Sequence, residues 1–259
     1  MQSVDPQAVS AIIRQVAEEV ILPRFQRLSS AEVTEKSPGQ LVTVADTEAE
    51  RQLSRHLVGL LPSSRVVGEE GAAADPSVLD RLVGADGAVW ILDPIDGTTN
   101  FANGRKGFAV IVALVVEGRT VQGWIHDPLA NRTAIAALGE GSWVDDRRLT
   151  VPPEGPIAAM IGSAGWRRNE RLGKAVAKMV RQGCVAHDYL DLIEGRLQFA
   201  HFRRLHPWDH AAGVLLHQEA GGYGALIDGT PYRPVPLHNG LLLAPGRASW
   251  EQLASLIGE

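Results

Sequence analysis

An apolar strand that runs directly into two aspartates and a glycine is the feature that most constrains the fold of this chain. The run Ala-Val-Trp-Ile-Leu at residues 88–92 has no charged side chain, which is typical of a strand buried on both faces. It continues into Asp93-Pro94-Ile95-Asp96-Gly97-Thr98-Thr99-Asn100-Phe101. Proline fixes one backbone angle, and aspartate and glycine favour a turn. We therefore expect Asp93 and Asp96 to point into one small space.

This arrangement favours a metal site beside a phosphate site. Two carboxylates held close together repel each other, so each needs a compensating cation, and Mg²⁺ takes oxygen ligands. The carbonyl of Ile95 is the one further hard ligand between the two aspartates. If a helix starts at Gly97, the free N–H groups of Gly97 and Thr98 form a seat for phosphate. The alternative is an Asx turn followed by a helix cap, the usual explanation of an isolated Asp-Pro or Asp-Gly pair.

Two further acidic segments weaken that alternative. Glu69 and Glu70 follow the short apolar strand predicted at residues 65–68, and Asp209 lies in the first turn of a helix that starts at Pro207. Each has an ordinary explanation by itself, as a solvated loop or as a capping acid. Their joint occurrence with Asp93 and Asp96 indicates a cluster of carboxylates around divalent ions.

Composition excludes several classes of partner and site. The 259 residues carry 25 Lys and Arg against 30 Asp and Glu, a net charge of −5, and no basic run that would bind nucleic acid. A single cysteine, Cys184, excludes an intramolecular disulfide and a cysteine-based zinc cluster. Apolar runs are shorter than the roughly 20 residues of a membrane span. Without a visible secretory signal, we expect a soluble, cytoplasmic protein with no membrane partner.

Apolar spacing in the first half predicts two helices followed by a meander. The helices run from Asp5 to near Pro23 and over residues 47–61. After strands at 65–68 and 88–92, consecutive strands are predicted at 108–116, 120–126, 133–137 and 141–144. Strands that follow one another across short turns imply antiparallel pairing.

The second half alternates instead. Strands are predicted at 157–161, 197–202 and 241–244, and helices at 169–181, 189–194, 207–220 and 249–257. The pattern indicates an α+β or layered α/β architecture. We divide the chain into an N-terminal α+β half, residues 1–150, with most metal ligands, and a C-terminal α/β half, residues 151–259, with Asp209. The two halves are expected to pack as one unit.

Taken in order, these motifs resemble the inositol monophosphatase family of Mg²⁺-dependent, lithium-sensitive phosphatases. The matching segments are Lys36 with residues 41–46, residues 68–70, residues 93–101, residues 207–213 and residues 219–222. They cover nearly the whole chain, and their number and order make the resemblance specific. It implies a layered αβαβα sandwich of the inositol monophosphatase and sugar phosphatase type, with a predominantly antiparallel N-terminal sheet.

The resemblance also implies roles for single residues. Glu69, Asp93 and the Ile95 carbonyl resemble the ligands of a first Mg²⁺. Asp93 also resembles a bridge to a second ion held by Asp96 and Asp209, and Glu69 would help to hold a third, weaker ion. The family therefore implies two or three Mg²⁺ ions.

The catalytic residues that the resemblance implies are Asp46, Thr98 and Glu69. Asp46 and Thr98 would orient the attacking water with Glu69 nearby, and the amides of Gly97 and Thr98 would hold the phosphate. Lys36 resembles the family's lysine near the weaker metal position, and a surface lysine is the alternative. No protein nucleophile is required, so direct attack by metal-activated water is expected.

The segments that the family uses to select its substrate depart from the family pattern. Gly183, Cys184 and Val185 form one such segment, and Val185 stands where alanine is usual. Phe202 stands seven residues before Asp209, where inositol-preferring members carry a glutamate. His187-Asp188 replaces a more apolar pair. These departures argue against inositol phosphate without affecting the metal site.

Other side chains near these segments have ordinary explanations. Arg203 and Arg204 are either a site for a second anionic group or paired surface arginines. His187, His201, His206 and His210 lack a convincing metal-ligand spacing and are interpreted as neutral or supporting residues.

The sequence therefore predicts a phosphoric monoester hydrolase, similar to inositol-1-monophosphatase, that acts on a small soluble phosphate ester. The alternatives are fructose-1,6-bisphosphatase, histidinol-phosphatase or 3′-nucleotide phosphatase activity. A different class of function is a metal-binding interaction module of transcription or ribosome assembly. A homodimer is expected because the family usually forms one.

Overall fold

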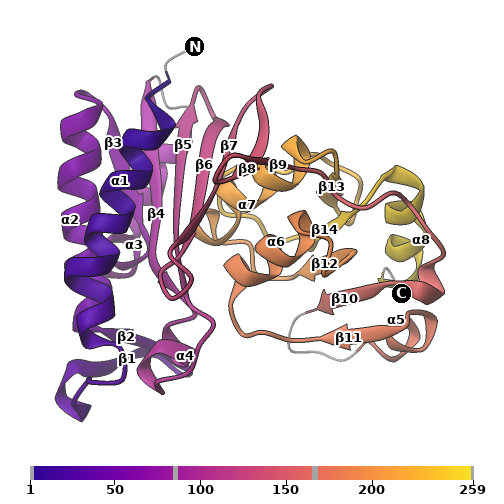
Figure 1. Cartoon of the computed structure of the whole chain (residues 1–259), viewed down its shortest axis with the longest axis horizontal. Coiled ribbons are helices and arrows are strands. Elements are labelled where there is room, and N and C mark those ends of the chain that lie inside the picture. Colours follow the sequence, from indigo (N-terminus) through magenta and orange to yellow (C-terminus); the bar gives the residue numbers. More distant parts are fainter. Residues whose placement is uncertain (1–2, 84–86, 165–168, 258–259) are drawn as a thin grey trace.

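The computed structural model describes residues 3–83, 87–164 and 169–257, which form alternating layers of helix and sheet (Figure 1). Helices α1 (Pro6–Val16) and α2 (Val44–Leu60) cover a seven-stranded sheet, α6 (Val185–Ile193) and α7 (Pro207–Glu219) form the middle layer, and α5 (Glu170–Ala175) and α8 (Arg247–Ile257) cover a five-stranded sheet. Three apolar cores hold the layers together: one lies between α1, α2 and the large sheet, one surrounds α6 and α7 between the two sheets, and one lies between the small sheet and α5 and α8. The predicted αβαβα architecture is confirmed.

The seven-stranded sheet keeps its strands in chain order. They are β3 (Arg65–Gly68), β4 (Ala88–Asp96), β5 (Ala109–Val116), β6 (Arg119–Asp127), β7 (Arg132–Ala137), β8 (Gly141–Val144) and β9 (Arg147–Leu149). Only β3 and β4 pair in parallel, and every later neighbour is antiparallel. The sheet is therefore predominantly antiparallel, as predicted, and β4 extends four residues beyond the expected strand.

The first helix begins where its sequence predicts. The Asp5 carboxylate accepts a 2.9 Å hydrogen bond from the backbone N–H of Gln7, and Pro6 occupies the first helical position. The helical segment continues to Pro23 in altered form, because α1 passes into a π-helical turn, η1 (Ala17–Ile21), and a 3₁₀ turn, η2 (Leu22–Arg24). Its apolar stripe packs with α2 against the buried indoles of the large sheet.

The five-stranded sheet has the order β11-β10-β12-β14-β13. Its strands are β10 (Ile161–Ala164), β11 (Lys178–Val180), β12 (Phe199–Phe202), β13 (Tyr223–Leu226) and β14 (Leu241–Ala244). Strand β10 is parallel to β11 and β12, whereas β14 is antiparallel to β12 and β13. Strand β12 lies in the middle of this sheet, and helices cover both of its faces, α6 and α7 on one and α5 and α8 on the other.

Several predicted elements of the second half are wrong. The predicted strand over residues 157–161 is instead a 3₁₀ turn, η5 (Ile157–Ala159), and β10 starts only at Ile161. The predicted helix over 169–181 ends at Ala175, because β11 pairs with β10 and tertiary pairing outweighs local helical spacing. Helix α6 starts at Val185, four residues earlier than predicted. Strand β13 was not predicted.

A small hairpin in the first half was also missed. Strands β1 (Val33–Ser37) and β2 (Gln40–Thr43) pair within a segment whose polar composition hides them, after a 3₁₀ turn, η3 (Ser30–Glu32). A longer 3₁₀ segment, η4 (Pro76–Leu82), precedes β4. Within the part of the chain that the structure describes, each helix is too short or too polar to cross a bilayer.

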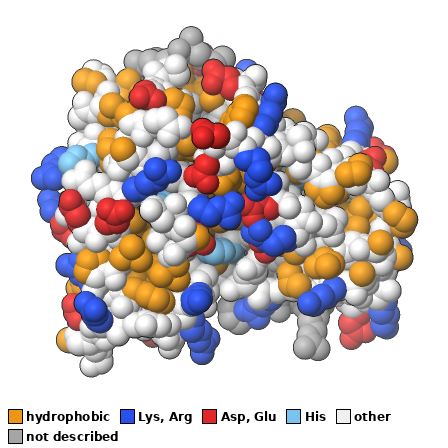
Figure 2. All heavy atoms as spheres, viewed as in Figure 1, with side chains coloured by type: hydrophobic (Ala, Val, Ile, Leu, Met, Phe, Trp, Pro, Cys, Tyr) orange, Lys and Arg blue, Asp and Glu red, His pale blue; other side chains and the backbone are white. Residues whose placement is uncertain are grey.

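Ion pairs join the two halves of the chain beside the middle layer. Acidic and basic side chains gather over the middle of the face shown in Figure 2. Arg132 of β7 pairs with Glu194, which follows α6, and Arg147 Nη2 of β9 lies 3.6 Å from Glu194 Oε1. Arg196 pairs with Glu194 and Asp191. The surroundings of Glu194 therefore belong to both halves.

Candidate active site

Strand β4 carries Asp93, Ile95 and Asp96 to its end in buried positions. The pairing with β5 shifts register between Asp93 and Asp96, so the two carboxylates lie across an irregularity in the strand. Asp93 is 1% exposed, and its Oδ1 accepts a 3.0 Å hydrogen bond from the backbone N–H of Ile95. The Asx turn considered from the sequence is therefore present, within a larger acidic cluster.

Gly97 ends this segment for two physical reasons. Its φ of 88° lies in the left-handed region, and a Cβ atom there would meet the carbonyl oxygen of Gly107 at 2.6 Å. It caps the five-residue helix α4 (Thr98–Ala102), so the helix start expected from the sequence is confirmed. The turn brings the hydroxyl of Thr98 back over the end of β4.

Asp46 faces that hydroxyl from the first turn of α2. Its Oδ2 accepts hydrogen bonds of 2.8 and 2.5 Å from the N–H and hydroxyl of Thr43, which form a capping box. Its Oδ1 accepts a 3.1 Å bond from the Thr98 hydroxyl, which also lies 2.9 Å from the Ile95 carbonyl oxygen. Burial, partly offset by the Thr43 bonds, raises the pKa of Asp46 to about 7. The buried Asp46 carboxyl therefore holds its proton more tightly than an exposed aspartate does.

Lys36 is the cation that the structure places against the acidic residues after β3. Its Nζ lies 2.8 Å from Glu69 Oε1 and 2.7 Å from Glu70 Oε1. Burial by itself lowers the pKa of Lys36, but the two carboxylates outweigh it and raise that pKa. Lys36 is therefore a half-buried partner of Glu69, not a solvated surface lysine.

Glu50 is a supporting residue that sequence reasoning missed. Its carboxylate accepts 2.8 Å hydrogen bonds from the backbone N–H groups of Glu70 and Gly71, at the start of α3 (Glu69–Ala74). Gly68 makes room for it, because a Cβ atom there would lie 2.3 Å from this carboxylate. Burial raises the pKa of Glu50 to about 7. Nothing in the local sequence of a helical glutamate indicates this contact, which depends on how α2 and α3 meet.

Asp209 joins the cluster from the first turn of α7. Burial and the charges of Asp96 and Glu69 raise its pKa well above the ordinary value, although Lys36 and a hydrogen bond with Asp93 oppose the shift. The pKa of Asp93 is also raised well above its usual range by burial and by the charges of Glu69 and Asp96. These carboxylates come from β4, α3 and α7, so the fold assembles the acids that the sequence singled out.

The donor set fits Mg²⁺ in its chemistry. Its members are carboxylates and a backbone carbonyl, and mutual repulsion in a buried place is relieved by a divalent cation. Among the described residues, no three His, Cys, Asp or Glu side chains form a ready-made metal cage. The contacts explain this: Lys36 holds Glu69, and the start of α6 holds Asp96. To bind a metal ion, Glu69 and Asp96 would have to exchange these partners for the ion.

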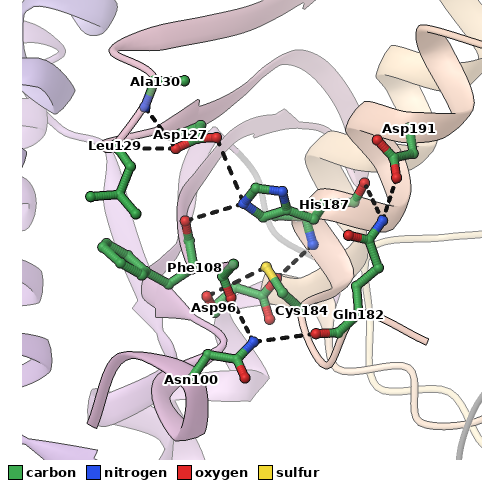
Figure 3. A network of polar contacts seen from close by, with 12 residues as sticks. Asp96, Asn100, Phe108, Asp127, Leu129, Ala130, Gln182, Cys184, His187 and Asp191 are labelled. Carbon is green, nitrogen blue, oxygen red and sulfur yellow. Dashed lines mark hydrogen bonds and ion pairs between the residues drawn. The ribbon is translucent and has the colours of Figure 1, made fainter. Parts of the chain in front are cut away.

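The segment expected to select substrate lies directly against Asp96 (Figure 3). Asp96 Oδ2 accepts a 2.5 Å hydrogen bond from the backbone N–H of Ala186 and lies 3.0 Å from Cys184 Sγ. Asn100 donates from Nδ2 to the carbonyls of Gly107 at 2.8 Å and Gln182 at 3.3 Å. Residues almost ninety positions apart in the sequence are thus in contact, and Gly183, Cys184 and Val185 lie where the two segments meet.

His187 extends this network toward β6. Its Nε2 lies 3.8 Å from Asp127 Oδ2 and 3.4 Å from the carbonyl oxygen of Phe108, as the dashed lines in Figure 3 mark. Asp127 also accepts backbone hydrogen bonds from Leu129 and Ala130. The His187 side chain therefore joins α6 to the large sheet.

Phe202 packs into an aromatic cluster of the middle layer. Its ring stacks on Tyr189 with centroids 5.3 Å apart, lies 4.8 Å from His210, and only 8% of the residue is exposed. The Tyr189 hydroxyl lies 2.9 Å from His210 Nδ1, and His210 Nε2 lies 2.8 Å from the Arg204 carbonyl. Burial lowers the pKa of His210 to about 4, so this imidazole is neutral near pH 7.

The comparison with family models decides the identity of the chain. The model described as "Inositol monophosphatase family" matches residues 1–259. The chain belongs to the inositol monophosphatase family. Its members are metal-dependent phosphatases, and the chain is accordingly a phosphoric monoester hydrolase.

Curated relatives carry more than one name. The chain is similar to inositol-1-monophosphatase of Bacillus subtilis, with 31% identity over 80% of each chain. It is similar to fructose-1,6-bisphosphatase/inositol-1-monophosphatase of Thermotoga maritima, with 32% identity over 73% of each. It is also similar to Nus factor SuhB of Pasteurella multocida, with 31% identity over 80% of this chain and 79% of that protein.

Solved structures of the family share the fold. Thermotoga maritima IMPase matches with a TM-score of 0.83 and 26% identity, over 96% of this chain and 94% of that one. An IMPase/NADP phosphatase complexed with Mg²⁺ and phosphate has a TM-score of 0.83 at 20% identity, over 96% and 93% of the two chains, a likeness in fold alone.

Proposed function

We propose that this family member is a Mg²⁺-dependent phosphomonoesterase that hydrolyses a small soluble phosphate ester by direct attack of water. The observation that carries the proposal is the buried cluster of Asp93, Asp96 and Asp209, whose pKa values are raised by burial and by the charges of neighbouring carboxylates, Glu69 among them. A fold needs no such cluster, whereas Mg²⁺ ions bound there would offset the repulsion.

The ligands proposed for a first ion are Glu69, Asp93 and the Ile95 carbonyl. Asp93, Asp96 and Asp209 would hold a second, and Glu69 would contribute to a third, weaker site if it exchanges Lys36 for the ion. When bound, Mg²⁺ lowers the pKa of a water molecule and stabilises charge on the phosphoryl and leaving-group oxygens. An IMPase/NADP phosphatase of the same fold is described as complexed with Mg²⁺ and phosphate.

Asp46 and Thr98 would orient the attacking water. The Thr98 hydroxyl proton faces Asp46 Oδ1 and the Ile95 carbonyl oxygen, so the lone pairs of the hydroxyl are left to accept a hydrogen bond from water. Asp46, with a pKa of about 7, would take up the proton that the water loses through Thr98. Glu69 would lie near the attacking water. The amides of Gly97 and Thr98 would hold the phosphate oxygens.

The organic part of the substrate would be selected by Gly183, Cys184, Val185 and Phe202. Because Phe202 is aromatic where inositol-preferring members carry a glutamate, a polyhydroxylated ring loses a charged partner there. Names of relatives support an inositol monophosphate-like ester and, second, a fructose 1,6-bisphosphate-like one. Histidinol phosphate and 3′-phosphonucleotides are further alternatives.

The test is phosphate release from inositol 1-phosphate, fructose 1,6-bisphosphate, histidinol phosphate and 3′-phosphoadenosine 5′-phosphate. Each ester is assayed with Mg²⁺, with EDTA, and with Mg²⁺ plus Li⁺. Metal-dependent, lithium-sensitive release from one ester supports the proposal and names the substrate. If the folded protein releases phosphate from none of these esters, the proposed substrate range is contradicted.

A binding function is a second candidate because relatives include a protein named Nus factor SuhB. Retention on an immobilised RNA polymerase complex, without turnover of any ester, would favour a metal-binding interaction module. The division at residue 150, the homodimer, the cytoplasmic location and the absence of a nucleic-acid partner stay predictions. Gel filtration with light scattering tests the dimer.

A further inference from the structure

A recess lies on the face of the five-stranded sheet that points away from α6 and α7. Side chains alternate between the two faces along a strand. On β12, Ala200 and Phe202 pack in the middle core with α6 and α7, whereas Phe199 packs in the outer core with α5 and α8. His201 therefore points to the outer face. Arg203 follows the last residue of β12 and lines the same recess as His201.

The recess has a volume of about 430 Å³ at the end of this sheet. Its polar lining comes from the end of β12, the turn after β13 and the residues before β14: His201, Arg203, Asp228, His238 and Asn239, with Gly240 between the last of these and the strand. Three segments distant in sequence thus converge on it.

His201 presents an unsatisfied nitrogen there. The residue is only 5% exposed, and its Nε2 has no hydrogen-bond partner among the described residues. A Cβ atom on Gly240 would lie 2.6 Å from this Nε2, so a side chain at position 240 would fill the space that Nε2 faces. A buried polar atom without a partner costs free energy unless a ligand or water satisfies it.

The hydrogen-bonding capacity left in the recess consists mainly of donors. The single carboxylate of its lining, Asp228, already accepts bonds at Oδ1 from the N–H and hydroxyl of Thr230 and at Oδ2, 2.6 Å away, from Asn239. Among the described residues, no hydrogen bond or ion pair engages the Arg203 guanidinium, which keeps five donors in a fork. This fork matches the paired oxygens of a carboxylate or phosphate group.

We propose that this recess is a second ligand site, which binds the carboxylate or phosphate group of a small anion through Arg203, with His201, His238 and Asn239 as supporting donors. The site is independent of the proposed hydrolysis, because the sheet separates it from the acidic cluster. Asp228 has a structural role in this recess, because its carboxylate holds the Asn239 amide. Its negative charge also repels anions that do not pair with Arg203.

The experiment follows the side-chain ¹⁵N and ¹H resonances of the histidines during titration with inorganic phosphate and, in parallel, acetate. The full chain is stripped of metal with EDTA and desalted, so that the acidic cluster repels anions and EDTA does not compete. Sodium chloride at equal ionic strength corrects for screening. Arg203→Gln is the test variant, and the adjacent Arg204→Gln is its matched control.

The expected result is a saturable shift of the His201 and His238 resonances, with Arg203→Gln weakening the affinity about tenfold or more and Arg204→Gln leaving it unchanged. The probe that binds with the higher affinity identifies the group, phosphate or carboxylate, that the site prefers. Three outcomes overturn the proposal: no shift, equal shifts in all histidines, or equal affinity in Arg203→Gln and the wild type. His206, which lies near Glu69 in the acidic cluster, reports separately on anions that enter there.

Discussion

The Thr98 hydroxyl donates a 3.1 Å hydrogen bond to Asp46 across 52 positions of sequence. Each partner is fixed by its own helix start: Asp46 closes the capping box of α2, and Thr98 follows the left-handed Gly97 at the start of α4. The pair therefore keeps its geometry without a ligand. Such preorganisation is what a proton-transfer pair needs, since its orientation is fixed before the reaction.

Replacing Thr98 with valine should lower kcat by about 100-fold, the usual range for the loss of a general acid–base partner. The change removes the hydroxyl between water and Asp46 and keeps the branched shape. Steady-state phosphate release with Mg²⁺ measures it. Thr99→Val is the matched control, because Thr99 is the exposed neighbour in the same helix. Equal loss in both variants would show that disturbance of α4, rather than the hydroxyl, is responsible.

Replacing Asp93 with asparagine should remove activity, by at least about 100-fold, because one residue is proposed to ligate two ions. The fold should survive: the asparagine Oδ1 can still accept the N–H of Ile95, and one repelling charge is gone. Melting of the metal-free protein should therefore occur at the same or a higher temperature than in the wild type. Normal turnover by a folded variant would contradict the metal assignment.

Asp188, which is not one of the proposed metal ligands, should make the stability of the protein depend on pH. The Ser163 hydroxyl donates a 2.9 Å bond to its Oδ2, while its buried Oδ1 has no partner among the described residues. Burial raises its pKa to about 7 from an ordinary value of 3.8. The unfolded chain loses this proton near pH 4, whereas the folded chain keeps it up to about pH 7. Its contribution to stability is therefore largest at low pH and declines as pH rises toward 7.

Asp188→Asn should remove that decline. Between pH 5 and pH 8, the free energy of unfolding of the wild type should fall relative to the variant by on the order of 2 kcal/mol. Urea unfolding of metal-free protein at both pH values measures the difference. Asp145→Asn, an exposed turn position with φ of 52°, is the control and should follow the wild type. A variant that tracks the wild type at both pH values would show that Asp188 is ionised throughout.

Spacing and residue type were enough to find the acids of the site but not their partners. Asp93, Glu69 and Asp209 each follow an apolar strand or begin a helix, and although each has an ordinary explanation by itself, their joint occurrence shows in the sequence. Glu50 looks like any solvent-facing helical glutamate until α3 places two N–H groups against it. Lys36 lies on a strand that polar composition concealed.

The same contrast holds for the fold. The meander from β5 to β8 is local, with short turns between neighbours, so hydrophobic alternation predicts it nearly residue by residue. Strand β11 has only three residues and pairs in parallel with β10, which comes 14 residues earlier at the closest. Local spacing cannot encode such a pairing, and it indicated a helix there.

Phe202→Glu tests the selection of substrate at a buried position. A glutamate there adds a charged hydrogen-bond acceptor for sugar hydroxyls, so activity toward inositol 1-phosphate should rise relative to the other esters. The same change removes the stacking on Tyr189 and buries a charge, which should lower the free energy of unfolding by about 3 kcal/mol. Phe202→Leu is the control for lost stacking alone and should leave the ratio of activities unchanged. If the ratio is unchanged in the glutamate variant too, Phe202 is a core residue that does not line the substrate pocket.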